Sequence, residues 1–293
     1  MTAAGVHLVK DALSIFKLRI GTAIMMSAIA GAAVAPGPMP APWRVATLAA
    51  AVFLASASAG AFNQWAEADL DRMTRRTAGR PFAAGRFRAG LPWLTAILAL
   101  LAFAVAAAFW AANGWAALHT FMGAFVYGVV YTVWLKRRSS INIIVGGLAG
   151  SFAVLAGAAA VNPAVQARPL LLAIVLFLWT PPHFWSLAIA SHDDYASAHV
   201  PMLPVVAGDA FSAKVILAHT LALVGVSVLP IFWSAGALYL LGAASGGAIF
   251  VWTSVRLAQQ PSRKRAIQNF LASLLQLALL LGGAVADRLA GSY

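Results

Sequence analysis

The sequence contains no cysteine and very little charge. Its 293 residues include no Cys, only 8 Asp and Glu, and 10% charged residues in all, whereas 62% are hydrophobic. Without cysteine the chain can form neither a disulfide nor a thiolate metal site. A mean hydropathy of +0.84 with so few charges is not the composition of a soluble domain. We therefore predict an integral membrane protein.

The alternation of apolar and polar residues that is typical of strands is also absent, so the apolar runs are expected to be helices. We predict an all-α membrane protein, a nine-transmembrane-helix bundle with a central cavity that forms one domain over residues 1–293. Pro36 and the charges ahead of the first span favour a retained helix over a cleaved signal peptide. The predicted spans, each of about 20 residues, are 18–35, 44–66, 92–111, 115–135, 142–161, 169–190, 214–233, 236–255 and 266–286.

Basic residues gather on one side of this predicted topology. Nine spans place all 20 Lys and Arg on the side of the N-terminus except Arg44, Arg168 and Arg288. By the positive-inside rule this side faces the cytoplasm of a bacterial-type inner membrane, so we expect the N-terminus and the two long loops there. Because the bases are scattered over loop ends, nucleic acid is not an expected partner. Seven of the 8 acids share this side, which no topology rule explains.

The loop after the second span carries the first acidic cluster, in NQWAEADLDRMTRRTAGRP at 63–81. Asn63, Glu67 and Asp71 recur every four residues, so a continuing helix would place them on one face and Asp69 on another. Stacked carboxylates repel each other near lipid unless a cation lies between them, and Mg²⁺ prefers carboxylate and amide oxygens. The alternative is a solvated helix end that nearby arginines neutralise.

The loop after the sixth span carries the second cluster, in WTPPHFWSLAIASHDDYASAHVPMLP at 179–204. Pro181 and Pro182 are expected to kink the span and expose carbonyl groups to the bundle interior. His183 lies within the membrane, where an ionisable group is a functional candidate. If the helix runs on, it shares a face with Asp194. The alternative for His183 is a neutral imidazole that is hydrogen-bonded to a neighbouring helix.

Together the two loops combine acids with bases at one end of the bundle. Guanidinium and ammonium groups recognise phosphate, and divalent ions bridge phosphate oxygens to carboxylates. The residues therefore predict a site in which Mg²⁺ and basic side chains hold a diphosphate. A membrane-embedded cavity below this site would suit a lipid tail.

Several strings resemble a known family. NQWAEADLD is similar to the N-x-x-x-D-x-x-x-D motif of UbiA-type intramembrane prenyltransferases, which have nine helices. DLDRMTRRTAGRP, YTVWLKRRSSINIIVGGLAG at 131–150 and the second loop resemble the protohaem IX farnesyltransferase (haem O synthase) branch. The resemblance implies Mg²⁺-assisted transfer of the farnesyl group of farnesyl diphosphate to a vinyl group of haem B, giving haem O. It also implies a haem A synthase or a terminal oxidase assembly as a partner.

The resemblance implies roles for individual residues as well. Its metal-binding and catalytic positions fall on Asn63, Glu67, Asp71, Asp193 and Asp194. Its bases near the diphosphate fall on Arg76, Arg80, Lys136 and Arg137. His183 is the candidate for binding haem. Glu67 departs from the family, which usually has Asp at this position.

Two other functions compete with this prediction. A quinone-type aromatic prenyltransferase would share the acidic motifs and the metal, although the PPHFW and PMLP strings favour haem. A haem or lipid transporter would use a broken helix and an intramembrane His as a translocation path. Consumption of farnesyl diphosphate distinguishes both enzymes from the transporter.

Overall fold

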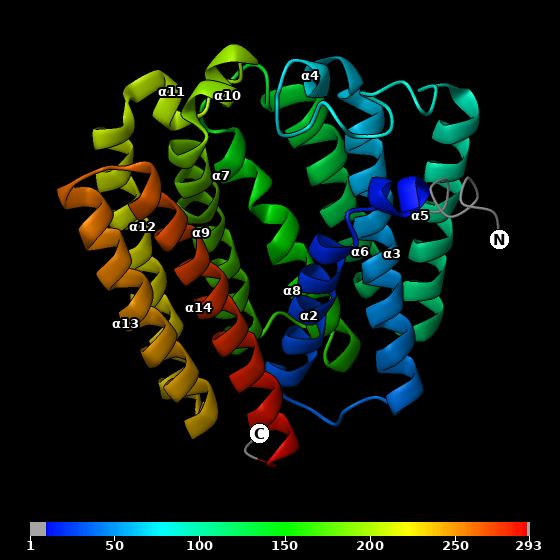
Figure 1. Cartoon of the computed structure of the whole chain (residues 1–293). Helices are drawn as coiled ribbons and strands as arrows, with labels where there is room; N and C mark the ends of the chain where they lie inside the picture. The colour runs from blue at the N-terminus through cyan, green and yellow to red at the C-terminus, as the bar shows by residue number, and fades with distance from the viewer. Residues whose placement is uncertain (1–9, 292–293) are drawn as a thin grey trace.

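The computed structural model describes residues 10–291, and the predicted single domain therefore extends beyond the described part at both ends. Helices make up most of this part, and it contains no strand, which confirms the predicted all-α class. The long helices lie alongside one another as a bundle, with short helices at one end (Figure 1).

The helical segments follow the predicted spans closely, because each is a long apolar run bounded by polar or turn-forming residues. The long segments are α2 (Leu18–Val34), α3 (Pro42–Ala66), α5 (Leu91–Ala111), α6 (Gly114–Phe125) with η1 (Val126–Leu135), α7 (Asn142–Gly146) with α8 (Leu148–Val161), α9 (Ala167–Ala190), α12 (Asp209–Val228) with η2 (Leu229–Trp233), α13 (Ala237–Gln259) and α14 (Arg263–Leu289). Three short helices join them: α4 (Ala68–Arg72), α10 (His192–Ser197) and α11 (Leu203–Ala207).

Eight of the long segments in the described part are long and apolar enough to cross a membrane. The remaining predicted span, 18–35, corresponds to α2, which has 17 residues and is shorter than the other eight. A multi-pass membrane protein is therefore supported by the length and composition of its helices. The ninth span stays a prediction.

Eight helices form two rings in which each helix packs against the next. We call α2, α3, α6 and α8 the first ring, and α9, α12, α13 and α14 the second ring. The rings meet where α2 and α8 pack on α9 and α14. Within the first ring α2 and α8 cross very closely, because a Cβ on Gly157 would lie 1.7 Å from the Ala28 carbonyl oxygen and one on Gly31 would lie 2.1 Å from that of Val154. Glycine at both positions permits this approach.

The short helices bring the two acidic clusters to one end of the bundle, where α4, α10 and α11 lie together (Figure 1). Leu70 of α4 belongs to the same buried apolar cluster as Trp185 of α9 and Ala198, Val200 and Met202, which follow α10. The two loops, separated by four predicted spans in the sequence, therefore share one core. This packing fixes α4 relative to the end of α9.

Two helices differ in detail from the predictions. The helix that carries the first cluster does not run on, since α3 ends at Ala66 and α4 begins at Ala68 around Glu67 (φ −109°, ψ 16°). Likewise α9 ends at Ala190, and Ser191 (φ −127°, ψ 37°) separates it from α10, so the predicted helical face from His183 to Asp194 is interrupted. By contrast, α9 continues through Pro181 and Pro182 as one helix.

Candidate active site

The first acidic cluster is buried at the end of α3. Asn63, Glu67 and Asp71 are only 2%, 1% and 4% exposed, so the alternative of a solvated helix end is wrong. The Asn63 amide donates to Glu67 Oε2 over 2.8 Å, which places these two side chains on one face as expected from their spacing. Asp69 points outward with a side chain that is 66% exposed.

Two predicted bases neutralise the buried carboxylates. Lys136 Nζ lies 2.5 Å from Glu67 Oε2, and Arg80 Nη1 lies 2.8 Å from both oxygens of Asp71. Breaking one partner of a buried ion pair leaves an uncompensated charge, so these contacts hold the cluster in place. The same cations lie where a bound polyanion would meet them.

A third cation, Lys17, was missed as a site residue by sequence reasoning, which used it for topology only. Its backbone adopts a left-handed conformation (φ 48°) directly before α2, and this turn directs the side chain into the bundle. Nζ donates to Asn63 Oδ1 and to the Tyr127 hydroxyl, the latter over 3.1 Å. Burial, with the nearby charge of Arg80, lowers the pKa of Lys17 to about 7. No sequence pattern marks this residue, because the contact depends on tertiary packing with Gly60, whose added Cβ would lie 3.3 Å from that of Lys17.

A π-helical segment, η1, supplies the remaining contacts of the cluster. The amide of Lys136 bonds the Tyr131 carbonyl five residues earlier, and the Thr132 hydroxyl bonds the Tyr127 carbonyl. Thr132 Oγ1 in turn accepts from the Asn63 amide over 3.0 Å. Such widened turns occur often at functional sites, because the extra residue re-aims the side chains that follow it. Here Tyr127 and Thr132 of η1, and Lys136 directly after it, face one end of α3.

The other two predicted bases, Arg76 and Arg137, have partners outside the buried carboxylates. Arg137 makes a two-bond pair with the outward-facing Asp69 at 2.8 and 2.9 Å, and this hydrogen bonding lowers the pKa of the Asp69 carboxyl. It is therefore directed away from the buried carboxylates. Arg76 is exposed but interacts with Tyr195 of α10. Burial raises the pKa of the Tyr195 hydroxyl, and the nearby Arg76 opposes this shift. The Arg76–Tyr195 contact links the two acidic clusters.

The second acidic cluster is more open. Asp193 is exposed, Asp194 is half-buried, and within residues 10–291 neither side chain forms an ion pair. Their neighbour His192 instead contacts Asp209 at 2.9 Å. Asp193 and Asp194 thus carry carboxylates that form no ion pair within residues 10–291, on the same short helix as Tyr195, which interacts with Arg76.

The first cluster fits Mg²⁺ by its donor set and by one unpaired atom. Within residues 10–291, Glu67 Oε1 is buried and has no hydrogen-bond partner, although Glu67 Oε2 accepts from both Asn63 and Lys136. A buried carboxylate oxygen without a donor is costly unless a ligand completes it. Carboxylate and amide oxygens are the groups that Mg²⁺ prefers. Within the described residues no three His, Asp or Glu side chains are gathered closely enough to hold a metal ion, so the predicted carboxylate ligands of the two clusters do not form one assembled site.

His183 is buried in the second ring. Its ring stacks between Trp179 and Phe270 at centroid distances of 4.2 and 4.4 Å, and Nδ1 lies 2.7 Å from Ser273 Oγ. The Ser273 hydroxyl donates to the Phe270 carbonyl over 2.6 Å, so its oxygen accepts from Nδ1–H of the imidazole. The hydrogen-bonded histidine expected as the alternative is therefore present, and Nε2 carries the lone pair in this tautomer. Haem binding by His183 stays a prediction.

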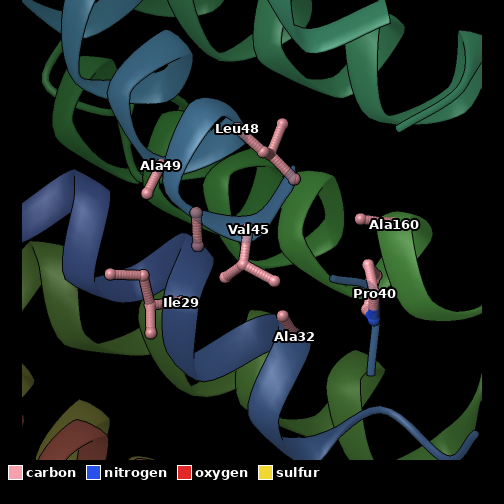
Figure 2. Close-up of a pocket in the computed structure, with 8 residues that line it drawn as sticks. Ile29, Ala32, Pro40, Val45, Leu48, Ala49 and Ala160 are labelled. Atoms are coloured by element: carbon pink, nitrogen blue, oxygen red, sulfur yellow. The ribbon is translucent and has the colours of Figure 1, made fainter. Parts of the chain in front are cut away.

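Two pockets lie in the first ring, at opposite ends. The pocket in Figure 2 is lined by apolar side chains of α2, α3 and α8, among them Ile29, Val45 and Leu48, and contains no group that could do chemistry. The other pocket begins at Lys17 and Tyr127, which contact each other, and Lys17 also contacts Asn63. Of these two pockets, only the second is lined by a side chain that contacts the acidic cluster.

Comparisons with known proteins agree with this fold. The UbiA prenyltransferase family model matches residues 24–279, and the chain belongs to this family. The chain is 56% identical to protoheme IX farnesyltransferase 2 of Paramagnetospirillum magneticum, with 94% of this chain and 96% of the relative covered, and 38% identical to protoheme IX farnesyltransferase of Parvibaculum lavamentivorans, with 98% and 91% covered.

Solved structures support the same fold. A UbiA homologue from Aeropyrum pernix K1 in its apo form superposes with a TM-score of 0.74 at 21% identity, covering 92% of this chain and 98% of the homologue. A UbiA homologue from Archaeoglobus fulgidus bound to DMAPP and Mg²⁺ gives 0.69 at 14% identity, covering 92% and 98%. The family and the fold together define the class of protein as an intramembrane prenyltransferase.

Proposed function

We propose that this chain transfers the farnesyl group of farnesyl diphosphate to a vinyl group of haem B, giving haem O and diphosphate. The observation that carries the proposal is the buried Asn63–Glu67–Asp71 cluster, which is surrounded by three cations and keeps one carboxylate oxygen without a partner. The relatives named protoheme IX farnesyltransferase, similar over nearly the whole chain, support the choice of substrates. A UbiA homologue bound to DMAPP and Mg²⁺ supports the metal.

The chemistry begins with ionisation of the allylic diphosphate. The C1–O bond breaks, and its electron pair leaves with the diphosphate, so negative charge grows on those oxygens. Lys17, Arg80 and Lys136 meet this charge in a buried setting, where such interactions are stronger than in water. Mg²⁺ bound by Asn63, Glu67 and Asp71, with Asp193 and Asp194 from α10, would neutralise further phosphate charge. The outer carbon of the haem vinyl group then bonds to C1, and water adds its oxygen to the inner carbon while a proton is released.

The bases that sequence reasoning assigned to the diphosphate divide into two groups. Arg80 and Lys136 contact the acidic cluster directly, and Arg76 lies between the clusters beside Tyr195. In our proposal these three bind the diphosphate. Arg137 acts indirectly, because its pair with Asp69 holds α4 against the loop after η1.

His183 is our candidate for the haem site. Stacking between Trp179 and Phe270 and the bond to Ser273 fix the orientation of its ring, and its tautomer offers Nε2 as a ligand atom. Replacing His183 by Ala is expected to weaken haem B binding, measured from the Soret band, without changing the affinity for farnesyl diphosphate. An unchanged haem titration would remove His183 from the proposal.

We further propose a bacterial-type inner membrane, with nine spans and with the N-terminus and both acidic loops in the cytoplasm. The charge distribution of the loops supports this orientation. The chain is expected to act as one domain, with haem B, farnesyl diphosphate and the lipid bilayer as its partners and with a haem A synthase or a terminal oxidase assembly receiving the product. A cysteine introduced at Asp193 and probed with an impermeant thiol reagent tests the orientation, since labelling from the cytoplasmic side alone is expected.

The experiment that tests the reaction offers two acceptors to purified protein in detergent with farnesyl diphosphate and Mg²⁺. Haem B is expected to yield a hydroxyethylfarnesyl haem by mass spectrometry, and a quinone precursor is expected to yield none. Transfer to the quinone precursor alone would identify an aromatic prenyltransferase. Binding of haem B without consumption of farnesyl diphosphate would identify a transporter.

A further inference from the structure

The face of α3 that carries Asn63 continues below it as a row of small side chains. Val52, Ala55, Ser56, Ala59 and Gly60 recur at helical spacing on this face, and all of them line the pocket below the acidic cluster. Because none of them is larger than valine, α3 leaves space where most membrane helices would pack a longer side chain. The wall of the pocket is thus built into the same helix face as the metal motif.

The other three helices of the first ring complete the pocket. Ile20 and Ile24 come from α2, Ala149 and Ala153 from α8, and the segment from His119 to Tyr127 from α6 and the start of η1. Each of these helices contacts its neighbours around the ring. Ile20 is 50% exposed, so the pocket opens beside it. The result is a narrow apolar space enclosed by four helices that has the cationic end of the site as its roof.

The ionisable side chains of the pocket lie at its two ends, and small or apolar side chains lie between them together with the Ser56 hydroxyl. Lys17 and Tyr127 lie at the roof, whereas His119 lies eight residues below Tyr127, or about 12 Å along the helix. His119 Nδ1 is buried and has no hydrogen-bond partner among the described residues, and the ring of His119 packs against Phe152 at a centroid distance of 5.9 Å. An apolar chain extended past this point would surround a polar imidazole whose Nδ1 has no protein partner, which is unfavourable. His119 therefore closes the apolar part of the pocket.

We propose that His119 limits the length of the isoprenoid chain that this pocket can hold. The proposal rests on the proposed function, since it needs the diphosphate to lie between Lys17 and the acidic cluster. The pocket begins at Lys17, next to this position of the diphosphate. An isoprenoid chain attached to the diphosphate would therefore enter the pocket directly. Ser56 lines the pocket on α3, midway between Gly60 and Val52. A larger side chain at this position is therefore expected to shorten the pocket.

Binding of three chain lengths tests the proposal without any acceptor. Dissociation constants for geranyl, farnesyl and geranylgeranyl diphosphate are measured with Mg²⁺ on the full-length protein in detergent. Ser56→Phe is expected to weaken the binding of farnesyl diphosphate, relative to that of geranyl diphosphate, by about tenfold or more. His119→Ala is expected to strengthen the binding of geranylgeranyl diphosphate, relative to that of farnesyl diphosphate, by a similar factor. The matched controls are Ser56→Ala, which keeps the volume of the pocket, and His119→Gln, which keeps a polar side chain at its far end. Both controls are expected to bind the three diphosphates in the same order of affinity as the wild type.

Three results of these measurements distinguish a failure of the inference about His119 from a failure of the proposed function. The wild type could bind allylic diphosphates while Ser56→Phe and His119→Ala keep the wild-type ratios of dissociation constants between chain lengths within about twofold. In that case the pocket does not select chain length, and the inference fails while the proposed function stands. If His119→Ala instead alters the Soret band of bound haem, haem occupies the pocket and the inference is overturned. If no allylic diphosphate binds the wild type, the proposed function and the inference fail together.

Discussion

The two four-helix rings of the bundle have similar outlines and different interiors. The first ring is lined by alanine, glycine and serine around a pocket below a charged site. The second ring is filled by large buried side chains, among them Leu223, Tyr239 and Phe250. Between these side chains it also holds a buried hydrogen-bonded network centred on Asn269. The difference indicates that the first ring has kept space for a ligand, whereas the second ring stabilises the structure and holds His183 in place.

The largest expected effect comes from the acids above the first ring. Asp71→Asn keeps the shape of the side chain but removes the charge that pairs with Arg80 and would bind Mg²⁺, so we expect turnover of farnesyl diphosphate to fall by about 10²–10³-fold or more. Mass spectrometry of the haem product measures the loss. Asp69→Asn, two residues earlier on the exposed face, is the matched control and is expected to stay within about twofold. Equal losses in both variants would contradict the assignment of a buried metal cluster.

Lys17 is expected to have the next largest effect on catalysis. Lys17→Met retains the apolar stem and removes the ammonium group beside Asn63, so we expect kcat to fall by about tenfold or more. The control is Lys10→Met, which removes a charge from the exposed start of the same segment. Steady-state kinetics at saturating farnesyl diphosphate compare the two. Wild-type turnover in Lys17→Met would show that this lysine has a structural role only.

The hydrogen-bonded network around Asn269 in the second ring is expected to affect stability and not turnover. Asn269 is fully buried, accepts from Thr253 and Ser254, and donates to Ser186. Asn269→Ala removes these interhelical bonds, and we expect a loss of about 1–2 kcal/mol, seen as a lower thermal midpoint in detergent. The kcat of the protein that remains folded is expected to change by less than about twofold. A large loss of turnover in Asn269→Ala at unchanged stability would show that the network around Asn269 takes part directly in the reaction.

The smallest expected effect concerns the exposed pair of Asp69 and Arg137. The pKa of the Asp69 carboxyl is lowered by its bonds to Arg137, so the pair stabilises the fold above the ordinary pKa of the carboxyl and loses this contribution as pH falls through the lowered value. Asp69→Asn is therefore expected to lower the thermal midpoint slightly at neutral pH and to match the wild type in acid. A difference that persists in acid would mean that Asp69 acts through something other than its charge.

The fold was largely predictable from the sequence, because long apolar runs in lipid leave little choice but helices. The predicted span 142–161 has the same limits as α7 with α8, and 169–190 lies within α9. The break at Glu67 and the π-helical η1 could not be predicted, since each depends on side chains from other helices that satisfy the local backbone. Local propensity gives no sign of such tertiary effects.

The site was predictable in its acids and only partly in its bases. Spacing placed Asn63 and Glu67 on one face and Asp69 on another, and both features are present. The role of Lys17 depends on a left-handed turn and on contacts across more than forty residues, which are invisible in a linear pattern. Arg137 looked equivalent to Lys136 in the sequence, yet the end of η1 directs the two side chains to different acids.

The most direct test of the account is the Mg²⁺ dependence of product formation from haem B and farnesyl diphosphate, followed by mass spectrometry in the wild type and in Asp194→Asn. We expect a hydroxyethylfarnesyl haem to form with Mg²⁺ and not to form when EDTA removes the Mg²⁺. We also expect that Asp194→Asn needs more Mg²⁺ for the same rate, because α10 and the segment from Glu67 to Asp71 would contribute carboxylates to one site. A product that forms equally well in EDTA, or a variant with the wild-type requirement for Mg²⁺, would contradict the claim that the two acidic clusters act together on the diphosphate.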